Sequence, residues 1–154
     1  MRHESEKRMS TKFREAVKRD HNAIQSLLER TKLPTEAVDS GAAAFYVGES
    51  DGIIVGAAGF EFYGNDALLR SVAVEPSAQR RGLGSEIVDF MVDLARQKKL
   101  RNVVLLTETA KGFFAKKNFQ VIDRSSVENE AMKQSPEFTY ACPKSAVCMI
   151  LGLR

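Results

Sequence analysis

The spacing of apolar residues changes along the chain and predicts a mixture of strands and helices. Alternating or continuous apolar stretches predict strands over residues 13–17, 44–47, 53–63, 67–74, 103–106, 119–122 and 146–151. Apolar residues three and four positions apart predict two longer helices, one with Ile24, Leu27 and Leu28, the other with Leu83, Ile87, Phe90, Met91 and Leu94. The chain therefore combines both kinds of element, as an α/β (α+β) fold does.

Short polar motifs predict where several elements begin and end. We expect Asp20 to cap the first helix, and Asp51–Gly52 to form a hairpin turn between two strands. Thr107 or Thr109 is expected to cap a later helix, because a side-chain oxygen just before a helix can accept from its first N–H groups. Ser135–Pro136 is expected to open a short helix with a proline in the first turn.

The order of elements in the second half of the chain predicts one pair of parallel strands. Glu75–Pro76 ends the strand over 67–74, and a helix begins after Gly82. The wholly apolar segment 103–106 then fits a strand buried on both faces after a crossover helix. Because tight turns join the earlier strands, we expect a mixed central sheet of about six or seven strands flanked by helices, with parallel pairing only around the fourth and fifth strands.

Composition fits one globular domain in a chain of 154 residues. Hydrophobic residues make up 44% and charged residues 28%, which excludes a disordered chain, a collagen-like repeat and a disulfide scaffold. Residues 1–10 are polar and have no apolar period, so we expect them to form a flexible tail. Residues 11–154 are then expected to form the single domain.

Charge and apolar runs restrict the partners and the location. With 23 Lys and Arg against 20 Asp and Glu, the net charge is +3, which suits a small anionic ligand and argues against nucleic acid. No apolar run approaches the roughly 20 residues of a membrane span, and no apolar stretch follows Met1 as in a signal peptide. We therefore expect a cytoplasmic protein that binds no membrane. His3 is the one histidine of this tail, and a single histidine makes no metal site, so no metal is expected.

The segment Gln79–Ser85 lies between a strand and a long helix, where backbone N–H groups have no intrahelical acceptor. A glycine at 84 costs the helix up to about 1 kcal/mol, and Arg80 and Arg81 place positive charge at the positive end of the helix dipole. Both costs are offset if a pyrophosphate lies against the turn. An ordinary glycine turn with solvated arginines remains the alternative.

This motif resembles the Gln/Arg-x-x-Gly-x-Gly/Ala signature of the GNAT acyltransferase superfamily, with Gln79, Gly82 and Gly84 after the strand over 69–74. The resemblance extends from Phe13 to the C-terminus and implies the GNAT fold, with acetyl-CoA as cosubstrate and no metal. A dinucleotide-binding fold fits poorly, because Gly-x-Gly-x-x-Gly is absent and the strands before the loop are antiparallel in this interpretation.

A narrower resemblance lies in residues 68–74, in 105–110 with Phe113–Phe114, in Glu137–Phe138 and in 142–149. These segments are similar to the N-acetyltransferases of bacterial arsenic-resistance operons and, more distantly, to the acetyltransferase domain of N-acetylglutamate synthase. The likeness implies that the acceptor is a small amine, either an amino acid or an amino-acid-like compound such as an arsenical. Two alternatives stay open, a non-catalytic acyl-CoA-binding regulator and a protein-lysine acetyltransferase. The resemblance also allows a homodimer.

By resemblance, the fourth strand and the loop after it bind acetyl-CoA. The backbone of Val72, Ala73 and Val74 would pair with pantetheine, and the Val72 N–H would face the oxyanion. The pyrophosphate would be held by Gln79, Arg80, Arg81, Gly82, Leu83, Gly84 and Ser85.

A general base is needed because an amine with a pKa near 10 is about one part in a thousand neutral at pH 7. Glu61 is our first candidate, since it lies between Phe60 and Phe62 and faces away from both; a solvated outer face is the alternative. Glu75 is the second candidate and is expected close to Glu108, at the ends of the fourth and fifth strands.

Arg70 is the candidate for binding an acidic group of the acceptor, because a charged side chain on a central strand needs an acidic partner. An internal ion pair with a residue such as Glu61 is the alternative. Ser71, Thr107 and Thr109 are further candidates for acceptor binding.

The general acid of many family members, a tyrosine, is replaced within Phe113–Phe114, and Asn118 stands where those proteins have glycine. A hydroxyl such as that of Ser71 or Tyr140 would have to protonate the thiolate, or CoA would leave without such help. Cys142 and Cys148 are expected to be structural, because two thiols are one short of a three-thiolate arsenic site.

Overall fold

The computed structural model describes residues 11–141 and 145–154, so the predicted tail over residues 1–10 and Cys142 lie outside the described residues. The strands form a seven-stranded sheet in the order β1-β2-β3-β4-β5-β7-β6. The chain divides into two compact units, Met1–Phe60 with Ser71–Met91, and Glu61–Arg70 with Val92–Arg154. We call them unit 1 and unit 2. That residues 11–154 form one domain stays a prediction.

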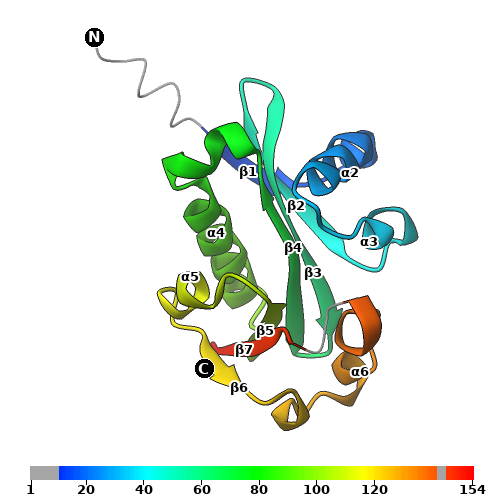
Figure 1. The fold of residues 1–154 in the computed structure, drawn as a ribbon, viewed down its shortest axis with the longest axis vertical. Helices are drawn as coiled ribbons and strands as arrows, with labels where there is room; N and C mark the ends of the chain where they lie inside the picture. Colours follow the sequence, from blue (N-terminus) through cyan, green and yellow to red (C-terminus); the bar gives the residue numbers. More distant parts are fainter. Residues whose placement is uncertain (1–10, 142–144) are drawn as a thin grey trace. The chain divides into compact units, whose positions relative to one another are not determined.

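Unit 1 contains the first strands and helices (Figure 1). Its elements are β1 (Lys12–Glu15), η1 (Lys18–Asp20), α2 (His21–Arg30), α3 (Glu36–Ser40), β2 (Ala44–Ser50), most of β3 (Ile53–Tyr63), the end of β4 (Asp66–Val74), η2 (Pro76–Arg81) and the start of α4 (Leu83–Gln97). β1, β2 and β3 pair antiparallel. Asp51 and Gly52 both have positive φ, as the predicted hairpin turn requires.

The sheet of unit 1 is covered on both faces. Apolar residues of α2 and α3 pack against β2 and β3, among them Ile24, Leu27, Leu28, Phe45 and Val47. The intervening Tyr46 points the other way, where its ring lies 6.1 Å from that of Phe90 in α4. This alternation follows from the two-residue period of a strand.

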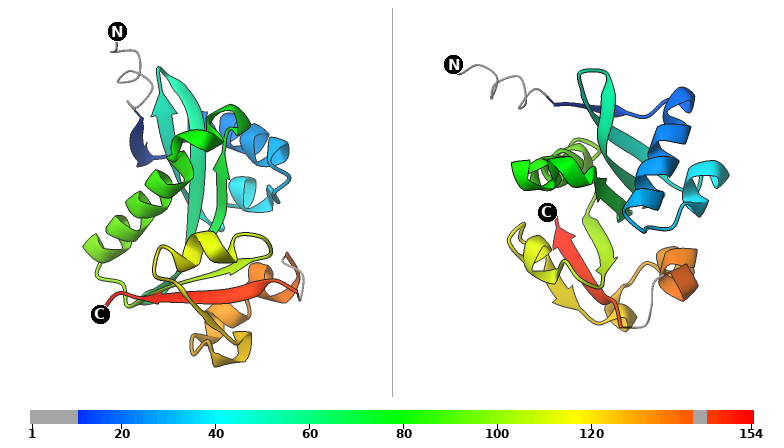
Figure 2. Two further views of the ribbon diagram at one scale, coloured as in Figure 1. Left: turned by 60° about the vertical axis from the view of Figure 1, so that its left-hand side comes forward. Right: turned by 45° about the horizontal axis from the view of Figure 1, so that its top comes forward.

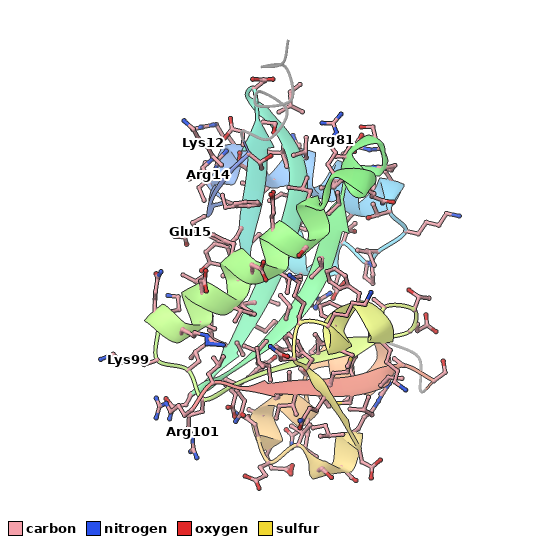
Figure 3. The ribbon with its side chains drawn as sticks, turned by 90° about the vertical axis from the view of Figure 1, so that its left-hand side faces the viewer. Lys12, Arg14, Glu15, Arg81, Lys99 and Arg101 are labelled. Carbon is pink, nitrogen blue, oxygen red and sulfur yellow. The ribbon has the colours of Figure 1, made fainter. Side chains whose placement is uncertain are left out.

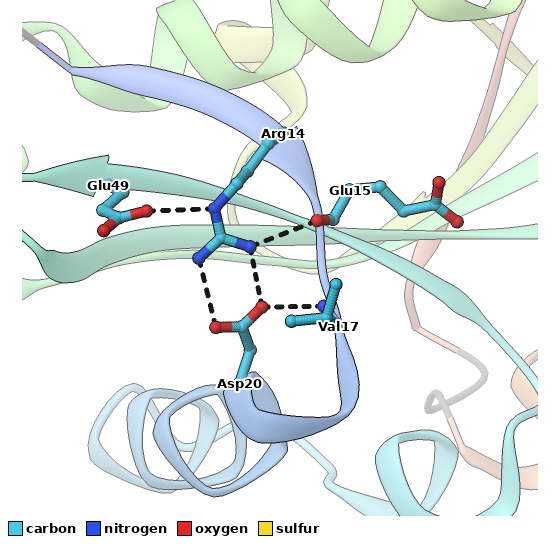
Figure 4. Close-up of polar contacts among 5 residues, drawn as sticks. All are labelled: Arg14, Glu15, Val17, Asp20 and Glu49. Atoms are coloured by element: carbon cyan, nitrogen blue, oxygen red, sulfur yellow. Dashed lines mark hydrogen bonds and ion pairs between the residues drawn. The ribbon is translucent and has the colours of Figure 1, made fainter.

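Asp20 precedes α2, but the prediction that it caps this helix was wrong. No side-chain capping bond is made to the helix. Instead its carboxylate accepts from both Nη atoms of Arg14, at 2.8 and 3.1 Å, and from the Val17 N–H (Figure 4). Arg14 also donates to Glu49 at 2.9 Å and so joins β1, β2 and η1. A fully donating guanidinium outcompetes helix N–H groups for the carboxylate.

Unit 2 contains the ends of β3 and α4, the start of β4 and the rest of the chain (Figure 2). Its further elements are β5 (Asn102–Thr107), α5 (Lys111–Ala115), β6 (Gln120–Ile122), η3 (Arg124–Ser126), α6 (Glu130–Lys133), the π-helix η4 (Glu137–Ala141) and β7 (Val147–Gly152). β4 and β5 pair in parallel, and β7 pairs antiparallel with both β5 and β6. The mixed sheet with a parallel fourth and fifth strand is therefore confirmed.

The central strand of unit 2 is buried on both faces, as its apolar run predicted. Val103, Val104, Leu105 and Leu106 are all buried. One face of the sheet packs against Met132 of α6 and other apolar residues of the same cluster. Among the described helices, none combines the length and apolar character needed to cross a membrane.

Candidate active site

The loop after β4 has the backbone shape expected for binding an anion. The η2 turn ends at Gly82, whose φ of +77° only glycine adopts without strain. The Glu86 N–H donates to the Gly82 carbonyl at 3.1 Å, so α4 starts immediately after this glycine. The N–H groups of the first turn, up to Ser85, precede the helical bonding pattern and form the positive end of the α4 dipole.

Gly84 is not required by the packing of the protein. A Cβ on Gly84 would meet Val74 at 3.7 Å, an ordinary contact, and the residue has no positive φ. An alanine would therefore fit there and favour the helix. A close-lying ligand is a physical reason to keep a glycine here, and the geometry thus fits a CoA pyrophosphate.

Two side chains of the loop have distinct surroundings within unit 1. Gln79 donates from Nε2 to the carbonyl of Val74 at 3.1 Å and so ties η2 to the end of β4. Arg81 is exposed and projects from the loop (Figure 3). Leu83 is buried against Ala78 and Val74, which fixes the first turn of α4. The side chain of Arg80 lies outside the described part.

Within β4, Ser71 has a φ of +57°, a left-handed conformation that is rare for a residue other than glycine. The alternation of buried and less buried residues breaks here, since Ser71 and Val72 are both half-buried whereas Ala73 and Val74 are both buried. A residue in this conformation inside a strand locally interrupts its ladder. No sequence signal indicated this break, because serine carries no preference for it.

Glu61 and Arg70, the first base candidate and the acceptor candidate, contact each other in unit 2. Arg70 Nη1 lies 2.7 Å from Glu61 Oε2, and both side chains are almost completely buried. The Tyr63 hydroxyl donates to the other oxygen of Glu61. Arg70 Nη2 is 3.6 Å from Oε1 of buried Glu137. The internal ion pair that the sequence left open is thus present, and Glu61 does not lie on a solvated face.

The sequence reasoning missed three members of this buried cluster: Tyr63, Ser135 and Glu137. Burial, followed by the bond to Glu61, raises the pKa of Tyr63 to about 12, and Ser135 also bonds the hydroxyl. Glu61 and Tyr63 are two apart on one strand and so share a face, a relationship the sequence could have indicated. Glu137 is remote in sequence from β4. It belongs to the narrower resemblance, but nothing in the sequence indicated its contact with Arg70.

Glu75, the second base candidate, directly follows β4 and is more accessible than Glu61. Its Oε2 accepts from Arg30 at 2.7 Å in an ion pair at the surface of unit 1. Among the described residues, none makes a hydrogen bond to its Oε1. The Glu75 backbone is fixed, because its N–H donates to the Val55 carbonyl at 2.8 Å.

The segment after β5 holds its polar residues in separate local contacts. The prediction that a threonine caps α5 was wrong: the residue before the helix is Ala110, and no side chain caps it. Thr107 Oγ1 instead accepts from the Ala110 N–H at 3.0 Å. Ala110 precedes the helix by one residue, so this bond satisfies no N–H of α5 itself. Thr109 is exposed, and Glu108 accepts from Ser145 at 3.3 Å.

The aromatic pair in α5 is structural. Phe114 is buried, and its ring packs edge-to-face against Phe113 at 5.0 Å and Phe119 at 5.5 Å. Asn118 has a φ of +75°, which explains why a glycine would also suit this position. The side chain of Tyr140, one candidate hydroxyl, lies outside the described part.

In the described residues, no three His, Cys, Asp or Glu side chains gather as a metal would need.

Comparison with known proteins agrees with this geometry. The family model described as "Acetyltransferase (GNAT) domain" matches residues 41–121. The structure of Rv2747 from Mycobacterium tuberculosis in complex with CoA and NLQ aligns over 93% of this chain and 99% of that chain, with 29% identity and a TM-score of 0.77.

Two further solved structures share the fold at lower identity. N-acetylglutamate synthase from Neisseria gonorrhoeae, complexed with coenzyme A and N-acetyl-glutamate, aligns over 94% of this chain with 20% identity and a TM-score of 0.79. This chain spans only 35% of that protein's length. The ribosomal-protein-S18-alanine N-acetyltransferase from Escherichia coli aligns over 92% of this chain and 93% of its own, with 16% identity and a TM-score of 0.73. Since the family model covers more than half of the chain, the chain belongs to the GNAT acetyltransferase family.

Proposed function

We propose that this protein transfers the acetyl group of acetyl-CoA to the amine of a small amino-acid-like molecule, a class that includes amino-acid-like arsenicals. The observation that carries the proposal is the loop Gln79–Ser85. The protein has room for a Cβ at Gly84, so packing does not require a glycine there, and this glycine lies in the first turn of a 15-residue helix, where an anion can bind. The acceptor class rests on two similar structures, one holding N-acetyl-glutamate and the other NLQ beside CoA.

We assign donor binding to backbone groups of unit 1. The N–H groups from Gly82 to Ser85 and the guanidinium groups of Arg80 and Arg81 would hold the pyrophosphate. Strand bonds to pantetheine would come from the backbone of Val72, Ala73 and Val74. Ser71 would interrupt the hydrogen bonding of β4 just before Val72. The Val72 N–H would then be directed at the carbonyl oxygen of the acetyl group, on which negative charge develops during the reaction.

We propose Glu75 as the general base in preference to Glu61. Both oxygens of Glu61 are engaged, one by Tyr63 and one by Arg70. Glu75 has one oxygen without a described partner and follows β4 directly, next to the proposed oxyanion contact. It would accept the ammonium proton, directly or through water, so that the neutral amine can attack. As the new C–N bond forms, the C–S bond breaks and CoA leaves as the thiolate, which takes up the second proton released by the amine nitrogen.

We propose that Arg70 positions the strand break instead of contacting the acceptor. Its guanidinium already lies between Glu61 and Glu137, and its side chain is only 2% exposed. Arg70 directly precedes Ser71, so this ion pairing fixes the backbone from which the break starts. The hydroxyl of Ser71 in unit 1 would then contact the acceptor, and Thr107 and Thr109 of unit 2 are candidates by resemblance alone.

Thiol release from acetyl-CoA tests the function. We expect glutamate, glutamine or a related amino acid to raise the rate well above hydrolysis, with an N-acetylated product by mass spectrometry. If CoA binds but no amine raises thiol release, the protein is a non-catalytic acyl-CoA-binding regulator. If only lysine-containing peptides are acetylated, the small-molecule assignment fails.

A further inference from the structure

A cavity of about 550 Å³ lies in unit 2 at the amino end of β5, lined from the β3–β4 turn, β5, β7 and the segment after β6. This volume is within the range of sites for small ligands. β5 runs from Asn102, which lines the cavity, to Thr107, about 17 Å further at about 3.3 Å per residue. None of the residues assigned above to acetyl transfer lines this cavity.

The wall carries charges of both signs, supplied by Asp66, Arg101 and Glu128. Neutral amides hold the Asp66 carboxylate: Asn102 donates to one oxygen at 3.1 Å and Asn129 to the other at 3.0 Å. None of the three charged groups forms an ion pair with a residue that the structure describes. Their charges are therefore not neutralised by one another or by described neighbours.

The rest of the wall includes an apolar surface formed by Val104, Ile122, Val127 and Ile150. Val104 and Val127 are buried in the core cluster of unit 2, whereas Ile122 and Ile150 are only partly buried at its margin. Burying such margin atoms under an apolar group is favourable at about 25 cal/mol per Å². The cavity thus offers an apolar surface beside separated positive and negative groups.

We propose that this cavity binds a small zwitterion with an apolar side chain, that is, a free aliphatic amino acid, at a site separate from acetyl transfer. The guanidinium of Arg101 matches a carboxylate through two parallel N–H bonds. The carboxylates of Asp66 and Glu128 complement an ammonium group, and the aliphatic wall receives the side chain. A simple anion fits less well, because the wall has two acidic groups and one basic group.

Arg101 and Glu128 can be changed with little effect on the fold. The structural bonds of Arg101 are made by its backbone, with N–H to the Asn65 carbonyl at 2.7 Å and its own carbonyl accepting from Leu153 at 2.8 Å. Its side chain is exposed (Figure 3). The side chain of Glu128 is exposed as well. Lys99 is a matched control, since it is an exposed cation two residues away that does not line the cavity.

The test is an NMR titration of the full, ¹⁵N-labelled chain saturated with CoA. L-leucine should shift the amide signals of Asn65, Asn102 and Asn129. 3-Methylbutylamine, which lacks the carboxylate, and 4-methylpentanoate, which lacks the ammonium, should each bind about tenfold more weakly. Shifts confined to other residues, equal binding of either analogue, or no shift up to the solubility of leucine would overturn the proposal.

The variants separate this site from general surface charge. Arg101→Gln and Glu128→Gln should each weaken leucine binding about tenfold, whereas Lys99→Gln should leave it unchanged. An equal loss in Lys99→Gln, or no loss in Arg101→Gln, would contradict the site. The measurement does not depend on catalysis, so failure of the proposed acetyl-transfer function would leave its result intact.

Discussion

Arg70 and Glu61 form an ion pair of 2.7 Å although their side chains are only 2% and 3% exposed. A second carboxylate, that of Glu137, lies 3.6 Å from the same guanidinium. Charges removed from water to this extent are tolerated because they are paired, and loss of one partner leaves the other buried and uncompensated. This relationship decides how variants at Arg70 should behave.

Arg70→Lys should lower stability by about 1.5–3 kcal/mol, because lysine keeps the charge but not the planar fork that reaches two carboxylates. We expect kcat/KM for donor and acceptor to fall alike, since Arg70 acts through the backbone of β4. Urea unfolding and steady-state kinetics on both substrates measure these effects, with exposed Arg19→Lys as the control. If the stability of Arg70→Lys were normal and only kcat/KM for the acceptor fell, Arg70 would instead be an acceptor contact.

Two glycines of the loop should respond in opposite directions. Gly84→Ala should stabilise α4 by up to about 1 kcal/mol and raise the KM for acetyl-CoA, because the new methyl group occupies ligand space. Gly82→Ala should destabilise the protein by about 1–2 kcal/mol, because its φ of +77° strains any Cβ. Thermal melts and donor kinetics measure both. An unchanged donor KM in Gly84→Ala would remove this glycine from the donor site.

Glu75→Gln should reduce kcat by about a hundredfold or more, the usual effect of removing a general base. The residual activity should rise with pH without the ionisation step of the wild type, since only the fraction of already neutral amine then reacts. Glu29→Gln removes one exposed carboxylate from α2, one residue from the Arg30 partner of Glu75, and is the charge control. Near-normal kcat in Glu75→Gln would return the role to Glu61.

The contacts of Asp20 should make stability depend on acid pH. Arg14, through its hydrogen bonds, lowers the pKa of Asp20 from an ordinary value of 3.8 to about 2. The folded state therefore favours the ionised carboxylate, and its stabilising effect is complete above the ordinary pKa and is lost as pH falls through about 2. Unfolding free energies of wild type and Asp20→Asn should differ most near neutral pH and converge in acid. A constant difference would contradict this linkage.

Cys148 should be chemically unreactive in the folded protein. It is buried, and burial raises the pKa of its thiol to about 11, so the thiolate is scarce at pH 8. Brief iodoacetamide treatment followed by peptide mass spectrometry should find Cys148 unmodified in native protein and modified in denaturant. Rapid native labelling, or tight binding of trivalent arsenic that Cys148→Ala abolishes, would contradict a structural role.

Much of the fold could be predicted because local patterns and packing agree. The run Val103–Leu106 indicated a strand covered on both faces, and all four residues are buried. Asp51–Gly52 indicated a hairpin because both residues tolerate the positive φ that the turn needs. Caps were harder to predict, since Asp20 had a stronger partner in Arg14, a residue on another element.

The candidate site was only partly predictable. The loop from Gln79 to Ser85 was visible because a change of period and two glycines mark it locally. The pairing of Arg70 was left open between an acceptor and a protein carboxylate, because sequence does not reveal which charges meet. Contacts such as that of Arg70 with Glu137 depend on tertiary packing, and no local spacing carries them.

The position of β7 between β5 and β6 has a consequence for synthesis on the ribosome. β7 is the last strand of this sequence, yet it pairs with β5 over six residues and with β6 over three. Until residues 147–152 have left the exit tunnel, β5 lacks that neighbour and β6 has no strand to pair with. Unit 2 is then an incomplete sheet whose most apolar strand has an open edge, a condition that favours aggregation of a nascent chain.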